Sequence, residues 1–65
     1  MQLDDEISPP YNYYVYRRYD DGEEILEEIG NVRSFAEQRL NQILLAGDPI
    51  VAEIQIWPTG QGYAR

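Results

Sequence analysis

Apolar and polar positions alternate in two stretches of the chain and recur at helical spacing in a third. Residues 11–19 are rich in tyrosine and β-branched side chains, which favours a β-strand. In residues 50–57, isoleucine and alanine alternate with valine, glutamate, glutamine and tryptophan. This period of two is typical of a half-buried strand, and Pro58 is expected to end it.

The stretch between these two strands predicts an amphipathic helix. Ser34 and Glu37 form a capping-box pattern, and Val32 is placed to act as a hydrophobic staple. Gly47 occupies the position of a C-cap glycine, and Pro49 prevents the helix from continuing. The apolar stripe expected to face the core consists of Ala36, Leu40, Ile43 and Leu44, widened by Phe35.

The pair Asp21-Gly22, which follows the first strand, is the strongest local signal in the chain. An Asp-Gly pair accepts the positive φ values of a tight two-residue hairpin turn. Residues 24–29 are therefore predicted to return as a second strand. A short helix over the same residues is the open alternative, because their apolar positions also fit helical spacing and Gly30 suits a C-cap.

A two-residue turn fixes the register of this hairpin, with Arg18 opposite Ile25, Tyr16 opposite Glu27 and Tyr14 opposite Ile29. Arg17 is then expected to pair with Glu24 or Glu28, and Arg18 with Glu27. A one-residue shift in either strand would move all of its side chains to the opposite face. The two predicted faces are Tyr14, Tyr16, Arg18, Ile25, Glu27 and Ile29, and Tyr13, Val15, Arg17, Tyr19, Glu24, Leu26 and Glu28.

The element order β-β-α-β predicts a small α+β fold, in which one helix packs on one face of a mostly antiparallel sheet. Residues 11–58 form the single domain, and the third strand can run in either direction beside the first. Residues 1–10 are charged and end in two prolines, which predicts a flexible arm. Residues 59–65 are either a tail or a short fourth edge strand.

The net charge of −7 lies entirely in the first half of the chain. Residues 1–30 hold nine carboxylates against two arginines, whereas residues 31–65 hold three of each. Five of the six tyrosines fall in residues 11–19. This acidic balance disfavours nucleic acid and anionic membranes, and it suits a basic protein partner. Without a long apolar segment or a basic leader, the chain is expected to be cytoplasmic.

Histidine, cysteine and lysine are all absent from the chain. Their absence removes the commonest general base and the commonest metal ligands, so we expect no enzyme, no cofactor and no metal site. The sequence Asp20-Asp21-Gly22 lacks the ligand spacing of a calcium loop. The acidic run is therefore interpreted as a recognition surface.

These patterns favour a non-catalytic module that inhibits a larger protein by occupying its basic, nucleic-acid-binding surface. It is similar in general character to inhibitors that phages and mobile elements carry, anti-CRISPR proteins among them. The alternative is an assembly subunit that forms a homodimer, since the core of a 65-residue chain is marginal. The predicted partner-binding residues are Asp20, Asp21, Glu23, Glu24, Glu27, Glu28, Tyr13, Tyr16, Tyr19 and Trp57.

Overall fold

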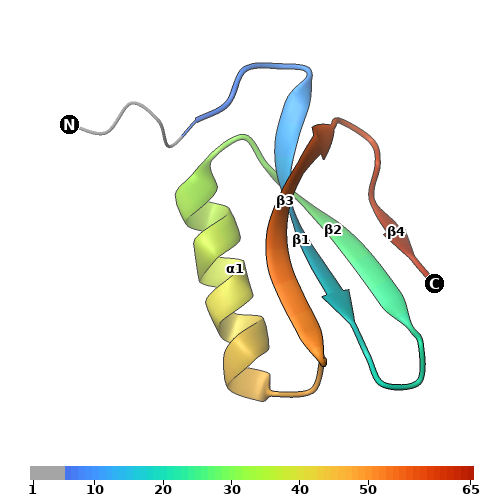
Figure 1. Cartoon of the computed structure of the whole chain (residues 1–65). Helices are drawn as coiled ribbons and strands as arrows, with labels where there is room; N and C mark the ends of the chain where they lie inside the picture. The colour runs from blue at the N-terminus through green and yellow to red at the C-terminus, as the bar shows by residue number, and fades with distance from the viewer. Residues whose placement is uncertain (1–5) are drawn as a thin grey trace.

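The computed structural model of the chain describes residues 6–65. Its elements are β1 (Tyr11–Arg18), β2 (Glu24–Gly30), α1 (Arg33–Ala46), β3 (Val51–Pro58) and β4 (Tyr63–Ala64). The strands form one antiparallel sheet in the order β3-β1-β2-β4, with α1 packed on one face (Figure 1). The predicted α+β fold is confirmed, and so is the short fourth strand.

The β1–β2 hairpin closes through a longer loop than the sequence predicts. The amide of Tyr19 donates to the carbonyl of Glu23 at 2.9 Å, and the amide of Gly22 donates to the carbonyl of Tyr19 at 3.0 Å. The loop therefore consists of three residues, Asp20, Asp21 and Gly22. Gly22 adopts a φ of 92°, the left-handed conformation that ends such a three-residue loop. The expected two-residue turn is wrong.

The longer loop shifts the hairpin register by one residue. Tyr16 lies opposite Leu26 and Arg18 opposite Glu24, in place of the predicted Glu27 and Ile25. Because side chains alternate along a strand, the shift moves every β2 side chain to the face opposite the predicted one. The two predicted faces are therefore wrong in how they combine the strands, since the β2 residues of each lie with the β1 residues of the other. The side of the sheet beneath α1 thus holds Tyr13, Val15, Arg17, Ile25, Glu27, Ile29, Ala52, Ile54 and Ile56.

The hydrophobic core lies between this side of the sheet and α1. Its buried members are Tyr13, Val15, Ala36 and Ile43, and Ile7, Ile29, Leu40, Ala52 and Ile54 pack against them. The predicted stripe of α1 is confirmed for three of its residues, but Leu44 is 55% exposed and Phe35 is 57% exposed. These two lie about 80° and 100° around the helix from Ala36, too far to reach the sheet.

The two ends of α1 compare differently with the prediction. Gly47 is the C-cap, with a φ of 76°, and its amide donates to the carbonyl of Ile43. The capping box would require Ser34 as the N-cap. The helix begins earlier, at Arg33, so Val32 is the N-cap and makes no side-chain cap hydrogen bond. Glu37 instead accepts a hydrogen bond at 3.0 Å from Nε of Arg33, one turn earlier.

The predicted flexible arm, residues 1–10, lies partly outside the described residues. Within residues 6–10, Glu6 forms an isolated β-bridge with Val32, and the amide of Ile7 donates to the carbonyl of Asn31 at 3.0 Å. Ile7 also packs against the core. This end of the arm is therefore attached to the segment that leads into α1.

Candidate functional site

The face of the sheet that α1 leaves uncovered is the candidate binding surface. We call it the open face. Strand alternation and the observed register assign its residues. They are Asn12, Tyr14, Tyr16 and Arg18 of β1, Glu24, Leu26 and Glu28 of β2, Val51, Glu53, Gln55 and Trp57 of β3, and Tyr63 of β4.

Two apolar side chains form a buried base for the open face, although no helix of residues 6–65 covers it. Tyr14 is 0% exposed and Leu26 is 4% exposed. The segment after β3 crosses to β4 at the opposite edge of the sheet (Figure 1), and Tyr14 holds it. The hydroxyl of Tyr14 donates to the carbonyl of Pro58 and accepts from the amide of Gln61. The C-terminal segment is thus part of the open face.

Two aromatic side chains, Trp57 and Tyr63, help to line a shallow depression of about 260 Å³ on this face. Its lining consists of Leu26, Gln55, Trp57, Gln61, Tyr63 and Arg65. The indole N–H of Trp57 donates to Oε1 of Gln55 at 2.7 Å, and the guanidinium carbon of Arg65 lies 4.2 Å from the ring centroid of Tyr63. These contacts hold both rings in place, and Trp57 remains 45% exposed. The depression is therefore suited to an apolar or planar side chain of a partner.

Tyr16 lies on the same face, beside Glu24. Partial burial raises the pKa of the Tyr16 phenol, and the charge and hydrogen bonding of Glu24 raise it further, against an opposing effect of Arg18. Tyr16 is therefore a neutral hydrogen-bond donor at physiological pH, close to a carboxylate. The structure brings the predicted residues Tyr16, Glu24, Glu28 and Trp57 together on the open face.

The remaining predicted acids of the hairpin lie at its tip. Asp20, Asp21 and Glu23 are exposed there, and within residues 6–65 no arginine forms a salt bridge with them. The open face adds three more carboxylates, those of Glu24, Glu28 and Glu53. Its only cations in the described chain are Arg18 and Arg65, and Nε of Arg65 lies 3.6 Å from Oε1 of Glu24. The tip and the open face together are therefore strongly acidic.

Glu27 does not belong to this acidic surface. It lies on the opposite side of the sheet, where Nη1 of Arg17 and Nε of Arg39 each approach its Oε1 to 3.0 Å. Two guanidinium groups thus neutralise it, which makes Glu27 unsuited to bind a basic partner from the open face. The predicted pairs of Arg17 with Glu24 or Glu28, and of Arg18 with Glu27, are wrong because the register differs.

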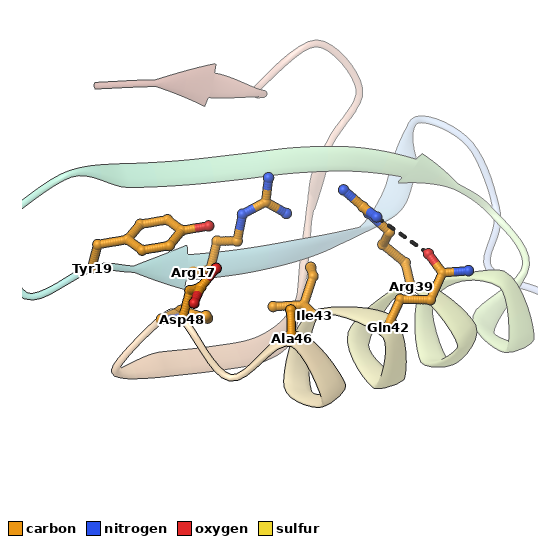
Figure 2. Close-up of a pocket in the computed structure, with 8 residues that line it drawn as sticks. Arg17, Tyr19, Arg39, Gln42, Ile43, Ala46 and Asp48 are labelled. Carbon is orange, nitrogen blue, oxygen red and sulfur yellow. Dashed lines mark hydrogen bonds between the residues drawn. The ribbon is translucent and has the colours of Figure 1, made fainter.

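Two of the predicted tyrosines also lie away from the open face. Tyr13 is 2% exposed and belongs to the core, so its ring offers no binding surface. Tyr19 lines a smaller depression of about 180 Å³ beside the C-terminal half of α1, where Figure 2 shows it near Arg17 and Asp48. Tyr63, in contrast, lies on the open face but is not among the residues predicted from the sequence. Its only sequence signal was the turn-forming Thr59-Gly60 before it.

Hydrogen bonds to the Glu28 carboxylate make the stability of the fold depend on pH. Nδ2 of Asn12 donates to Oε2 of Glu28 at 2.7 Å, and the amide of Gly60 donates to the same oxygen at 3.2 Å. Asn12 is the main cause, and Gly60 the second, of a pKa of Glu28 below its ordinary value. A folded-state pKa below the unfolded value stabilises the fold above the unfolded pKa, and this contribution is lost as pH falls through the folded pKa.

We therefore expect Asn12→Ala to move the pKa of Glu28 up toward its ordinary value, measured by NMR titration of the side-chain carboxyl carbon. Asn41→Ala, on the exposed side of α1, should leave that titration unchanged and serves as the control. An unaltered Glu28 titration in the Asn12→Ala chain would contradict the role given to this hydrogen bond.

Comparisons with models of protein families, with curated proteins and with solved structures find no match for this chain. Within residues 6–65, no helix is long and apolar enough to cross a membrane. Nor does this part of the chain contain a group of three or more acidic, histidine or cysteine side chains placed to hold a metal ion.

Proposed function

We propose that this chain is a small, acidic, non-catalytic protein-binding module of the cytoplasm. It binds a basic surface of a larger protein through the open face and the hairpin tip. The observation that supports this function best is the exposed ring of Trp57, which lines one depression with Tyr63 on the open face, a face that also carries Tyr16 and the carboxylates of Glu24, Glu28 and Glu53.

Aromatic rings and carboxylates have different parts in such an interface. Tryptophan and tyrosine bury a large area at a low cost in side-chain entropy, and they are frequent interface anchors. Exposed carboxylates add little affinity individually, but they accelerate association with a cationic surface and select against acidic ones. Affinity is thus assigned to Trp57 and Tyr63, and steering to Asp20, Asp21 and Glu23.

An inhibitor of nucleic-acid binding is the form of this function that the charges favour. On a protein whose basic surface binds nucleic acid, the carboxylates of the tip and the open face take positions otherwise occupied by phosphates. The mechanism is competition by steric exclusion and charge. Glu27 has no part in it, which makes the acidic surface smaller than the acidic run in the sequence.

The test begins with a partner captured on the immobilised chain from a lysate of its native host. Binding of the purified partner is then followed by fluorescence of Trp57, the single tryptophan of the chain. Glu23→Lys is expected to slow association with the partner on the order of tenfold at low salt, and less at high salt. Glu37→Lys makes the same charge change on the exposed side of α1 and should have little effect.

Equal effects of Glu23→Lys and Glu37→Lys would refute the acidic surface as the binding site. In a second assay, the chain should release a labelled nucleic acid from the captured partner. A partner that binds the chain and its nucleic acid at the same time would refute the inhibitory form of the function.

A further inference from the structure

Strand β3 lies at one end of the sheet, and one side of its backbone is unpaired within residues 6–65. The amide of Thr59 donates to the carbonyl of Pro10 at 2.6 Å, which makes these two a hydrogen-bonded pair. Hydrogen-bonded and non-hydrogen-bonded pairs alternate along an antiparallel ladder. The backbone groups of Val51, Glu53, Gln55 and Trp57 therefore point toward β1, and those of Ala52, Ile54 and Ile56 point outward.

Apolar side chains are exposed along the same edge. Ile50 is 59% exposed, Ile56 is 52% exposed and Trp57 is 45% exposed. Leu44, at 55%, lies on the same side of the molecule. It is about 140° around α1 from Arg39, and Arg39 contacts Glu27 of β2, so Leu44 faces the β3 edge. A long unpaired edge with exposed apolar side chains is a surface suited to strand addition.

We propose that a second copy of this chain pairs with β3, antiparallel, about a two-fold axis at Ile54. Ile54 of each copy lies opposite Ile54 of the other, and Ala52 lies opposite Ile56 of the other. Each of these residue pairs exchanges two backbone hydrogen bonds. The outward-facing backbone N–H and C=O groups of all three residues are thereby hydrogen-bonded. The two sheets then form one continuous sheet. This inference goes beyond the proposed function, because it concerns the unpaired backbone of β3, whereas the proposed function uses side chains of the open face and the tip.

The ends of the free edge determine this register. Pro58 has no N–H, and the amide of Ile50 already donates to the carbonyl of Arg18 at 2.8 Å. Neither residue offers a donor to an incoming strand, so the free donors are those of Ala52, Ile54 and Ile56. A slip of two residues in either direction would leave one of these three opposite Pro58 or Ile50. Self-pairing centred on Ile54 is therefore the register that uses every free donor.

Side chains on both faces are compatible with self-pairing in this register. On the side beneath α1, Ile56 of one copy lies beside Ala52 of the other. On the open face, Glu53 lies opposite Gln55 of the second copy, so no two carboxylates are directly opposed. Trp57 lies opposite Val51 of the second copy. The register that uses every outward-facing donor also opposes no like charges, and this double fit of the edge to itself is the reason to assign a second copy as the occupant.

The oligomeric state of the intact chain tests this proposal. Sedimentation velocity at tens of micromolar should give twice the chain mass of 7.6 kDa. Ile56→Lys places a charge in the interface at a position already 52% exposed, so the chain should stay folded by circular dichroism. We expect it to weaken the dimer on the order of 30-fold. Leu45→Lys, at an 88% exposed position on α1, should leave the dimer intact.

The register is tested by disulfide formation, because the chain has no cysteine of its own. Hydrogen-bonded residues of antiparallel strands have Cα atoms about 5.5 Å apart, within the range of a disulfide. Oxidised I54C chains should therefore form covalent dimers, and A52C chains should not. A monomeric wild-type chain, a dimer that survives Ile56→Lys, or cross-linking of A52C as efficient as that of I54C would overturn the proposal. Glu23→Lys should leave the dimer unchanged, which separates this test from that of the proposed function.

Discussion

Replacing Ile43 by alanine is expected to lower the free energy of unfolding by about 2–5 kcal/mol. Ile43 is 6% exposed and is one of four buried residues that join α1 to the sheet. Small domains bury a low fraction of their surface and have little stability in reserve. The loss is therefore comparable with the whole stability of the chain. Urea denaturation followed by circular dichroism measures it.

Leu44→Ala is the matched control, since it removes a similar volume from the neighbouring position of the same helix. Leu44 is 55% exposed, and its replacement should change the free energy of unfolding by about 0.5 kcal/mol or less. Both variants are best measured in the Ile56→Lys chain, so that dimer dissociation does not contribute. Equal losses for Ile43→Ala and Leu44→Ala would show that α1 packs on a different stripe.

Glu27→Gln is expected to have the second largest effect, a loss of about 2–3 kcal/mol in the free energy of unfolding. The side chain of Arg17 is 13% exposed, and its Nε is buried without a hydrogen-bond partner in the described part of the chain, residues 6–65. Without the Glu27 carboxylate, this guanidinium would remain buried and uncompensated. The loss stays below that of a fully buried pair because the Glu27 side chain is 33% exposed.

Glu24→Gln makes the same chemical change at an acidic position of the same strand that lies on the open face. Its partner Arg65 is 71% exposed, at 3.6 Å, so the loss should be under about 1 kcal/mol. Thermal unfolding of the two variants at low salt compares them directly. A similar loss in both variants would mean that Arg17 finds water or another acceptor when Glu27 is absent.

The elements of this fold could be predicted from the sequence because their signals are local. Alternation identified β3, turn-forming residues marked the hairpin, and Gly47 marked the end of α1. The register of the hairpin could not be predicted in the same way. A loop with Gly22 at its last position and a loop with Gly22 in a two-residue turn use the same residue types. The packing of Ile29 against the core beneath α1 distinguishes them.

The candidate site depended on that same choice. Glu24, Glu27 and Glu28 are equivalent in the sequence, yet the register places Glu27 beside two arginines and the other two on the open face. Tyr13 and Tyr16 likewise differ only in the face they occupy. Tyr63 became part of the site through the crossing of the C-terminal segment, which no local pattern encodes. Sequence composition thus identified the residue types of the surface, and tertiary pairing selected its members.

The short strand β4 limits how far this sheet can extend. It pairs with β2 through Ile25 and Leu26, and the backbones of Glu24 and Arg65 continue the ladder. A strand added at that edge of the sheet would pair with the two residues of β4, whereas a strand added at the other edge would pair with the eight residues of β3. Once β3 is occupied, head-to-tail growth has no comparable template. The architecture thus favours a closed assembly over a filament.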